Sequence, residues 1–233
     1  MTTPAAKFDA ARAEAYGVES RIALAGYEAC HELAACLLSA ALADTPEATI
    51  LVAGAGGTGQ EILAAGRLEP HWRFVAVDPS PPMLAGARAA VEAAGLAARV
   101  DFRLGEVSEL PAGATFAAAT LIGVLHHLPG EAAKRALLAG IAERLPAGAP
   151  FILAGNRGVY RARPQFLAAW RARWRMAGVA AAEIEARHAR IMAAAEPPAS
   201  DEAIAALLDG AGFTEPTLFF SSLFWGAWIA RRR

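Results

Sequence analysis

Short apolar runs rich in β-branched and aromatic residues alternate with alanine-rich stretches along most of the chain. The runs have the length of strands, and the stretches between them carry apolar residues at helical spacing. This alternation predicts an α/β fold built on a parallel sheet. We predict five buried strands at 48–53, 73–77, 100–103, 116–122 and 150–154, and intervening helices at 60–66, 80–94 and 130–144.

The two ends of the chain and one internal segment depart from this alternation. Residues from about 20 to 43 carry apolar positions at helical spacing up to Asp44-Thr45-Pro46, which predicts one helix before the first strand. From 160 to about 195 the strand pattern disappears, and a long helical segment rich in arginine and tryptophan is expected. A helix at 200–208 and two strands at 217–221 and 223–230 follow, so we expect the chain to close with an antiparallel hairpin.

Composition and charge narrow the class of protein. Apolar residues make up 55% of the 233 positions, which is enough for a large core. The net charge of -1 argues against nucleic acid or an anionic membrane as a partner. Cys30 and Cys36 form no C-x-x-C motif, and neither a signal-like N-terminus nor a membrane-length apolar run occurs. We expect a cytoplasmic protein without a metal site.

A glycine-rich turn joins the first predicted strand to the helix after it, in the segment ILVAGAGGTGQEIL. Its four glycines, Gly54, Gly56, Gly57 and Gly59, suit a turn that needs positive φ and close approach of the backbone to a ligand. Asp78 ends the next strand, where a carboxylate can accept hydrogen bonds from both hydroxyls of a ribose. The glycines alone are also compatible with a plain start of a helix, but together with Asp78 they indicate an adenosine-type site.

The same glycines fit the dinucleotide fingerprint, so a nicotinamide-dependent oxidoreductase is one alternative. The turn lies some fifty residues into the chain behind a helix, whereas a dinucleotide domain often begins with this strand. In addition, none of the three tyrosines has a lysine four residues later, so the common Tyr-Lys pair for hydride transfer is absent. A non-catalytic nucleoside-binding protein is a second alternative.

The order of these segments resembles the class I S-adenosylmethionine (SAM)-dependent methyltransferases over nearly the whole chain. The resemblance rests on the segments ILVAGAGGTGQE, VAVDPSPPMLAGAR, RLGEVSELP, LIGVLHHLP, LPAGAPFILA and LLDGAGFTEPTLFFSSLFWGAWIAR. GYEACHEL and the C-terminal segment are most similar to the branch that contains carboxy-SAM synthase. The resemblance implies a Rossmann-like sheet of seven strands in the order 3-2-1-4-5-7-6, with strand 7 antiparallel and helices on both faces.

The resemblance also implies SAM as cofactor and assigns residues to it. The glycines would line its methionine and ribose side, Asp78 would hold the ribose, Met83 would pack on adenine, and Gly123 and His126 would lie beneath the sulfonium. The implied cofactor residues are Gly54, Ala55, Gly56, Gly57, Gly59, Asp78, Pro79, Met83, Gly105, Glu106, Val107 and Gly123. One departure is Val52, because many relatives carry an acid two residues before the first glycine.

The acceptor side carries a weaker signal. Methyl transfer is an in-line displacement, so a general base is needed only for a protonated acceptor, and His126 and His127 are the candidates. The histidines are equally compatible with packing of the loop. The candidate substrate-binding residues are Arg21, Tyr27, Arg157, Tyr160, Arg161 and Trp170.

The helical segment is the expected lid of the acceptor site. Phe166, Trp170 and Trp174 recur every four residues and share one helix face. Residues 157–190 contain eight arginines but only two glutamates, which makes the segment strongly basic. This pattern fits an amphipathic helix with a solvated arginine face, a pocket for an aromatic or carboxylate-bearing molecule, or a surface facing tRNA.

The sequence therefore predicts a single methyltransferase domain over 1–233 that methylates oxygen or nitrogen of a small molecule. Its parts are an N-terminal helical segment (1–46), a nucleotide-binding core (48–157), a helical cap insertion (158–197) and a C-terminal helix with the closing hairpin (198–233). The apolar hairpin could support a homodimer or belong to the core.

Overall fold

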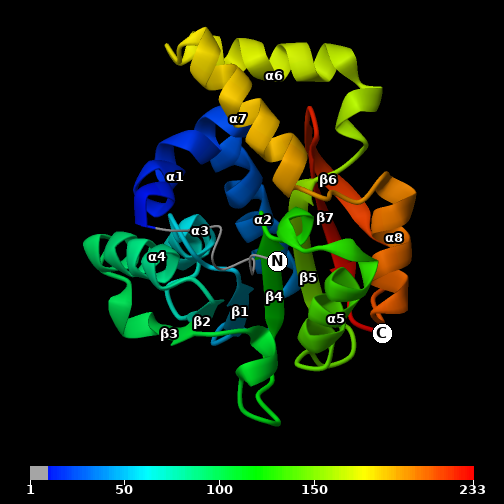
Figure 1. The fold of residues 1–233 in the computed structure, drawn as a ribbon. Coiled ribbons are helices and arrows are strands. Elements are labelled where there is room, and N and C mark those ends of the chain that lie inside the picture. The colour runs from blue at the N-terminus through cyan, green and yellow to red at the C-terminus, as the bar shows by residue number, and fades with distance from the viewer. Residues whose placement is uncertain (1–9) are drawn as a thin grey trace.

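The computed structural model describes residues 10–233, which form a seven-stranded sheet covered by helices on both faces (Figure 1). The strand order is β3-β2-β1-β4-β5-β7-β6, and β7 runs antiparallel to β5 and β6, as predicted. The strands are β1 (Thr49–Ala53), β2 (Arg73–Asp78), β3 (Val100–Leu104), β4 (Ala118–Ile122), β5 (Pro150–Asn156), β6 (Thr217–Ser222) and β7 (Trp225–Arg231).

Helices connect the strands and continue beyond them. The α-helices are α1 (Ala10–Ala23), α2 (Tyr27–Ala41), α3 (Gln60–Leu68), α4 (Pro81–Ala93), α5 (Gly130–Ala142), α6 (Pro164–Met176), α7 (Ala181–Ala194) and α8 (Asp201–Gly210). Short 3-10 turns follow β3 and β4 as η3 (Val107–Glu109) and η4 (Leu125–His127), and η5 (Tyr160–Ala162) precedes α6. No helix in residues 10–233 is both long and apolar enough to cross a membrane.

The core lies on both faces of the sheet because successive strand residues point to opposite sides. In β1, Ile50 and Val52 pack with α2, α3 and α4, whereas Leu51 and Ala53 pack with α5 and α8. The closing hairpin is part of this core, since Trp228 of β7 is buried on the α5 and α8 side.

The single helix predicted from about 20 to 43 is wrong, because two helices, α1 and α2, occupy this region. The chain turns at Gly26, which adopts a left-handed conformation with φ 85°. The positive φ favours glycine, and a Cβ at this position would also crowd the Phe220 ring at 3.1 Å. Residues 1–9 of the predicted N-terminal segment lie outside the described residues.

Helices α6 and α7 lie over the hairpin tip and α1 (Figure 1). The predicted aromatic stripe faces inward: Trp170 and Trp174 are buried with Tyr160 and Phe224, and Phe166 packs against them. Trp170 Nε1 donates a hydrogen bond to the carbonyl of Ala23 at 2.8 Å, which attaches α6 to the end of α1.

Candidate cofactor and acceptor site

The glycine turn and Asp78 meet at the carboxyl edge of the parallel sheet, where β1 and β2 end side by side. The Gly56 N–H donates to Asp78 Oδ2 at 2.9 Å, and the Ser80 N–H donates to Asp78 Oδ1 at 2.8 Å. Burial raises the pKa of Asp78, while these two backbone donors act in the opposite direction. Each carboxylate oxygen can accept a further hydrogen bond, as recognition of two ribose hydroxyls requires.

Three positions of the turn leave no room for a side chain. A Cβ on Gly56 would lie 2.5 Å from both Asp78 Oδ2 and Met83 Cβ. Gly54 has φ 71°, and a Cβ there would lie 2.2 Å from the Val124 side chain. Gly57 has φ 91°, and its N–H donates to the Met83 carbonyl at 2.8 Å. The turn is therefore shaped by backbone contacts to the loops after β2 and β4.

The remaining residues predicted for the cofactor lie along the same edge. The Gly105 N–H, after β3, donates to the Asp78 carbonyl at 3.1 Å, and Glu106 begins η3 with a capping box to Glu109. Ala55, Met83 and Val107 are buried, Gly59 caps α3, and Pro79 is exposed. The structure thus brings the loops after β1, β2, β3 and β4 together, which is where open α/β sheets bind ligands.

His126 lies in η4 after β4 and is buried between strands and cap. The Asn156 N–H donates to His126 Nδ1 at 3.4 Å. The His126 carbonyl accepts a hydrogen bond of 2.8 Å from the N–H of Glu196, just after α7. Its ring centroid lies 4.2 Å from that of His127 and 5.8 Å from that of Trp225. Gly123, three residues earlier, has φ 80° and donates its N–H to the Ala154 carbonyl at 2.9 Å. The loop after β4 is therefore tied to β5 and to the cap.

Tyr16 is a site residue that the sequence did not reveal. A Cβ on Gly57 would lie 2.4 Å from Tyr16 Cδ1, and a Cβ on Gly123 would lie 3.6 Å from its hydroxyl oxygen. The ring therefore extends from the glycine turn to the end of β4. No local motif marks it, because α1 reaches the turn only through the fold.

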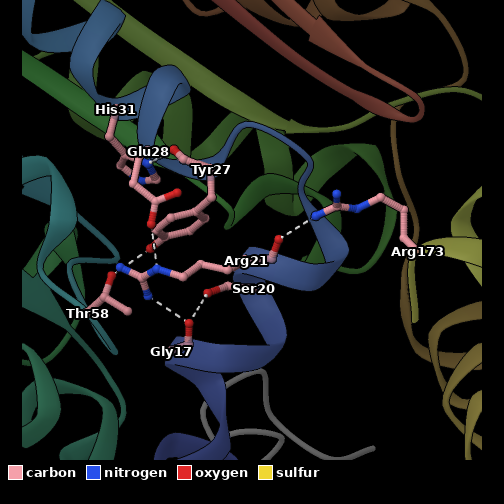
Figure 2. A network of polar contacts seen from close by, with 8 residues as sticks. All are labelled: Gly17, Ser20, Arg21, Tyr27, Glu28, His31, Thr58 and Arg173. Atoms are coloured by element: carbon pink, nitrogen blue, oxygen red, sulfur yellow. Dashed lines mark hydrogen bonds and ion pairs between the residues drawn. The ribbon is translucent and has the colours of Figure 1, made fainter. Parts of the chain in front are cut away.

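Arg21 and Tyr27, predicted on the acceptor side, lie beside the glycine turn in the network that Figure 2 shows. The Tyr27 hydroxyl is hydrogen-bonded to Thr58 Oγ1 at 2.6 Å, and burial raises the pKa of Tyr27 to about 12. The Arg21 guanidinium lies 4.8 Å from the Tyr27 ring centroid and donates to the Gly17 carbonyl at 2.7 Å. The network joins α1, α2 and the turn.

The other predicted substrate residues are placed differently. Arg157 forms an ion pair with Asp201 and donates to Ser221 Oγ at 2.8 Å, and Trp170 is buried on the inner face of α6. Tyr160 is also buried, and its hydroxyl accepts from Asn156 Nδ2 at 2.9 Å. Burial raises the pKa of Tyr160 above its ordinary range. Arg161 lines an open cleft of about 500 Å³ between α6 and α7, together with Leu167, Arg171, Glu185, His188 and Met192.

Residues 50–148 match the family model of the methyltransferase domain. No curated protein sequence matches the chain closely enough to count as a relative.

Solved methyltransferases share the fold at low sequence identity. A protein from Nostoc punctiforme PCC 73102 described as an O-methyltransferase superposes over 87% of this chain and 55% of its own, with TM-score 0.63 and 18% identity. An O-methyltransferase family 2 protein from Planctomyces limnophilus, in complex with apigenin, covers 88% and 62% at TM-score 0.59 and 17% identity. Human N-acetylserotonin methyltransferase in complex with SAM covers 85% and 51% at TM-score 0.58 and 16% identity.

The fold is that of the class I methyltransferases. The match of residues 50–148 to the methyltransferase domain and the fold shared with solved methyltransferases agree with the class of enzyme and of cofactor expected from the sequence. The chain spans 55%, 62% and 51% of the three solved chains.

Proposed function

We propose that the protein transfers the methyl group of SAM to an oxygen or nitrogen atom of a small molecule beneath the cap formed by α6 and α7. The observation that supports this most strongly is the double contact of Asp78 with the glycine turn and with Ser80, which presents a carboxylate at the sheet edge where open α/β folds bind ligands. The crowding at Gly56 supports the same assignment, because a cradle that a Cβ would fill is shaped for close approach of a ligand.

Asp78 would bind the ribose, and Met83 and Val107 would pack against adenine. The glycine turn and Tyr16 would enclose the methionine end. Bound SAM supplies an electrophilic methyl group, and the protein must align the acceptor with it and exclude water. Tyr16, which extends from the turn to Gly123, would exclude water on one side.

The acceptor would approach past the loop after β4. Because His126 Nδ1 accepts from the Asn156 N–H, a neutral His126 carries its proton on Nε2 and would orient the loop, while His127 is the candidate base. The open cleft beside Arg161 favours an acceptor with a planar anionic group. Oxygen is the favoured atom because two of the solved structures above are described as O-methyltransferases. Kinship with the carboxy-SAM synthase branch is part of the proposal and rests on the sequence resemblance alone.

Calorimetry with SAM and S-adenosylhomocysteine (SAH) tests the proposal directly. We expect both to bind, and no binding of either at about millimolar concentration would overturn it. Asp78→Ala should weaken SAH binding about 100-fold, because hydrogen bonds to a charged group contribute roughly 1.5–3 kcal/mol each. Asp101→Ala is the matched control, since Asp101 on β3 is exposed and paired with Arg103. An unchanged affinity of Asp78→Ala would show that the ribose contact is misassigned.

A further inference from the structure

Glu61 is a buried carboxylate directly behind the glycine turn. It is the second residue of α3, and its side chain is only 9% exposed. Burial and the nearby Asp78 carboxylate raise its pKa, while His31, with Nε2 3.9 Å from Glu61 Oε2, acts in the opposite direction. A buried carboxylate is costly without a close cation, and 3.9 Å is too long for a hydrogen bond. Among the described residues, the Glu61 carboxylate therefore has a hydrogen bond to its own backbone and a distant His31, but no cation at hydrogen-bonding distance.

A small cavity of about 10 Å³ adjoins Glu61 and is also lined by His31, Val52 and Thr120. The Thr120 hydroxyl is buried and has no hydrogen-bond partner in the described part of the chain. Most of its lining is apolar, from residues such as Leu38, Ile50 and Phe74. Glu61, His31 and Thr120 nevertheless supply the polar partners that one water molecule needs in a space of this size. Val52 is the strand position at which the resembling family often has an acid, so Glu61 brings a carboxylate from the helix side to the region that Val52 leaves apolar.

Hydrogen bonds connect this cluster to the turn itself. His31 Nδ1 donates to the Tyr27 carbonyl at 2.7 Å, and the Tyr27 hydroxyl is bonded to Thr58, three residues before Glu61 (Figure 2). Glu61 also acts electrostatically on Tyr27. The residues packed against Glu61 are therefore tied by hydrogen bonds to the turn that faces the proposed cofactor site.

We propose that the Glu61 carboxylate is the anionic group of the cofactor site, which stabilises the ammonium group at the methionine end of SAM, with one water molecule linking it to Thr120. The inference rests on the proposed function, because it assigns the charge recognition of that same site. Binding of the cation favours the ionised carboxylate, so any proton that Glu61 carries in the free protein is released to solvent. The titratable groups that face Glu61 are Tyr27, Cys30 and His31 of α2 and Asp78 of β2.

The test compares two ligands that differ in the amino-acid part, SAH and 5′-methylthioadenosine, by calorimetry. Glu61→Gln keeps the shape of the side chain but removes its charge, so it should weaken SAH about tenfold and leave methylthioadenosine unchanged. Glu32→Gln is the matched control, because Glu32 is an exposed acid next to His31 and should alter neither affinity. Equal losses for both ligands, or none for SAH, would overturn the inference.

A pH series on the unaltered protein gives an independent result that does not require the variant to fold. From about pH 5 to about pH 7 the preference for SAH over methylthioadenosine should increase, because a raised carboxyl pKa leaves part of Glu61 protonated at the lower pH. A preference that is independent of pH contradicts the inference. If the unaltered protein binds methylthioadenosine and SAH equally, the charge recognition fails alone; if it binds neither, the proposed function fails with it.

Discussion

The cofactor edge and the cap are built from different kinds of contact. At the edge, main-chain groups make most of the contacts: Gly56 and Ser80 donate to Asp78, and Gly57 donates to Met83. In the cap, side chains make most of the contacts: an aromatic cluster packs around Phe224, and arginines on α6 and α7 form ion pairs with glutamates of α7. Main-chain geometry restricts sequence at the glycines, whereas side-chain packing tolerates exchange of similar residues. The cap can therefore diverge with the acceptor while the edge keeps its cofactor.

Gly56→Ala should give the largest effect in this comparison, because the new Cβ would lie 2.5 Å from Asp78 and Met83. We expect SAH affinity to fall at least about 100-fold, since ligand geometry at the edge depends on this backbone approach. Calorimetry with SAH measures this loss of affinity. Gly140→Ala on α5 is the control, because a Cβ there meets nothing within 4 Å, and it should leave affinity unchanged while stabilising the helix by up to about 1 kcal/mol. Normal SAH binding by Gly56→Ala would show that SAH affinity does not depend on the close approach of the backbone at Gly56.

Trp170→Phe should give an intermediate effect, confined to the cap. The variant loses apolar contact and the hydrogen bond to the Ala23 carbonyl, so the free energy of unfolding should fall by about 2 kcal/mol, measured by denaturant titration. Trp174→Phe is a matched comparison, because Trp174 Nε1 has no hydrogen-bond partner in residues 10–233 and its loss should be smaller. SAH affinity should not change in either variant. A large loss of SAH affinity in Trp170→Phe would show that packing in the cap and SAH binding at the edge are not independent.

Arg187→Ala should give the smallest effect. Arg187 on α7 pairs with Glu183 and with Glu19 of α1, and its guanidinium lies 4.9 Å from the Trp174 ring centroid. The variant should lose about 1 kcal/mol of stability, and somewhat less at high salt because the glutamate partners are partly exposed and the pairs are partly screened. Arg190→Ala on the same helix is exposed and should be neutral. Equal losses in the two variants would show that the contact with α1 contributes nothing.

The sheet could be predicted because its signals are local. Strand and helix periods alternate along the sequence, and the glycine turn and Asp78 each mark the end of a strand. Tyr16 carried no such signal, since it reaches the turn from α1 only through the fold. Glu61 lies next to the turn in sequence, but its burial against α2 and β4 could not be read from the sequence. The break at Gly26 was missed because apolar residues continue at helical spacing through it, whereas its left-handed backbone and its contact with Phe220 appear only in the fold.

Helix α1 touches both regions, through Tyr16 at the glycine turn and through Ala23 at the cap. Two ligands that bind on either side of one shared helix form a thermodynamic cycle, and the free energy with which one favours the other is equal in both directions. If cofactor binding changes the position of α1 and so raises acceptor affinity, the acceptor must retain the cofactor by the same factor. Demethylated product would then leave more readily once the methylated acceptor has gone, so the order of release would be encoded in a helix that takes no part in the chemistry.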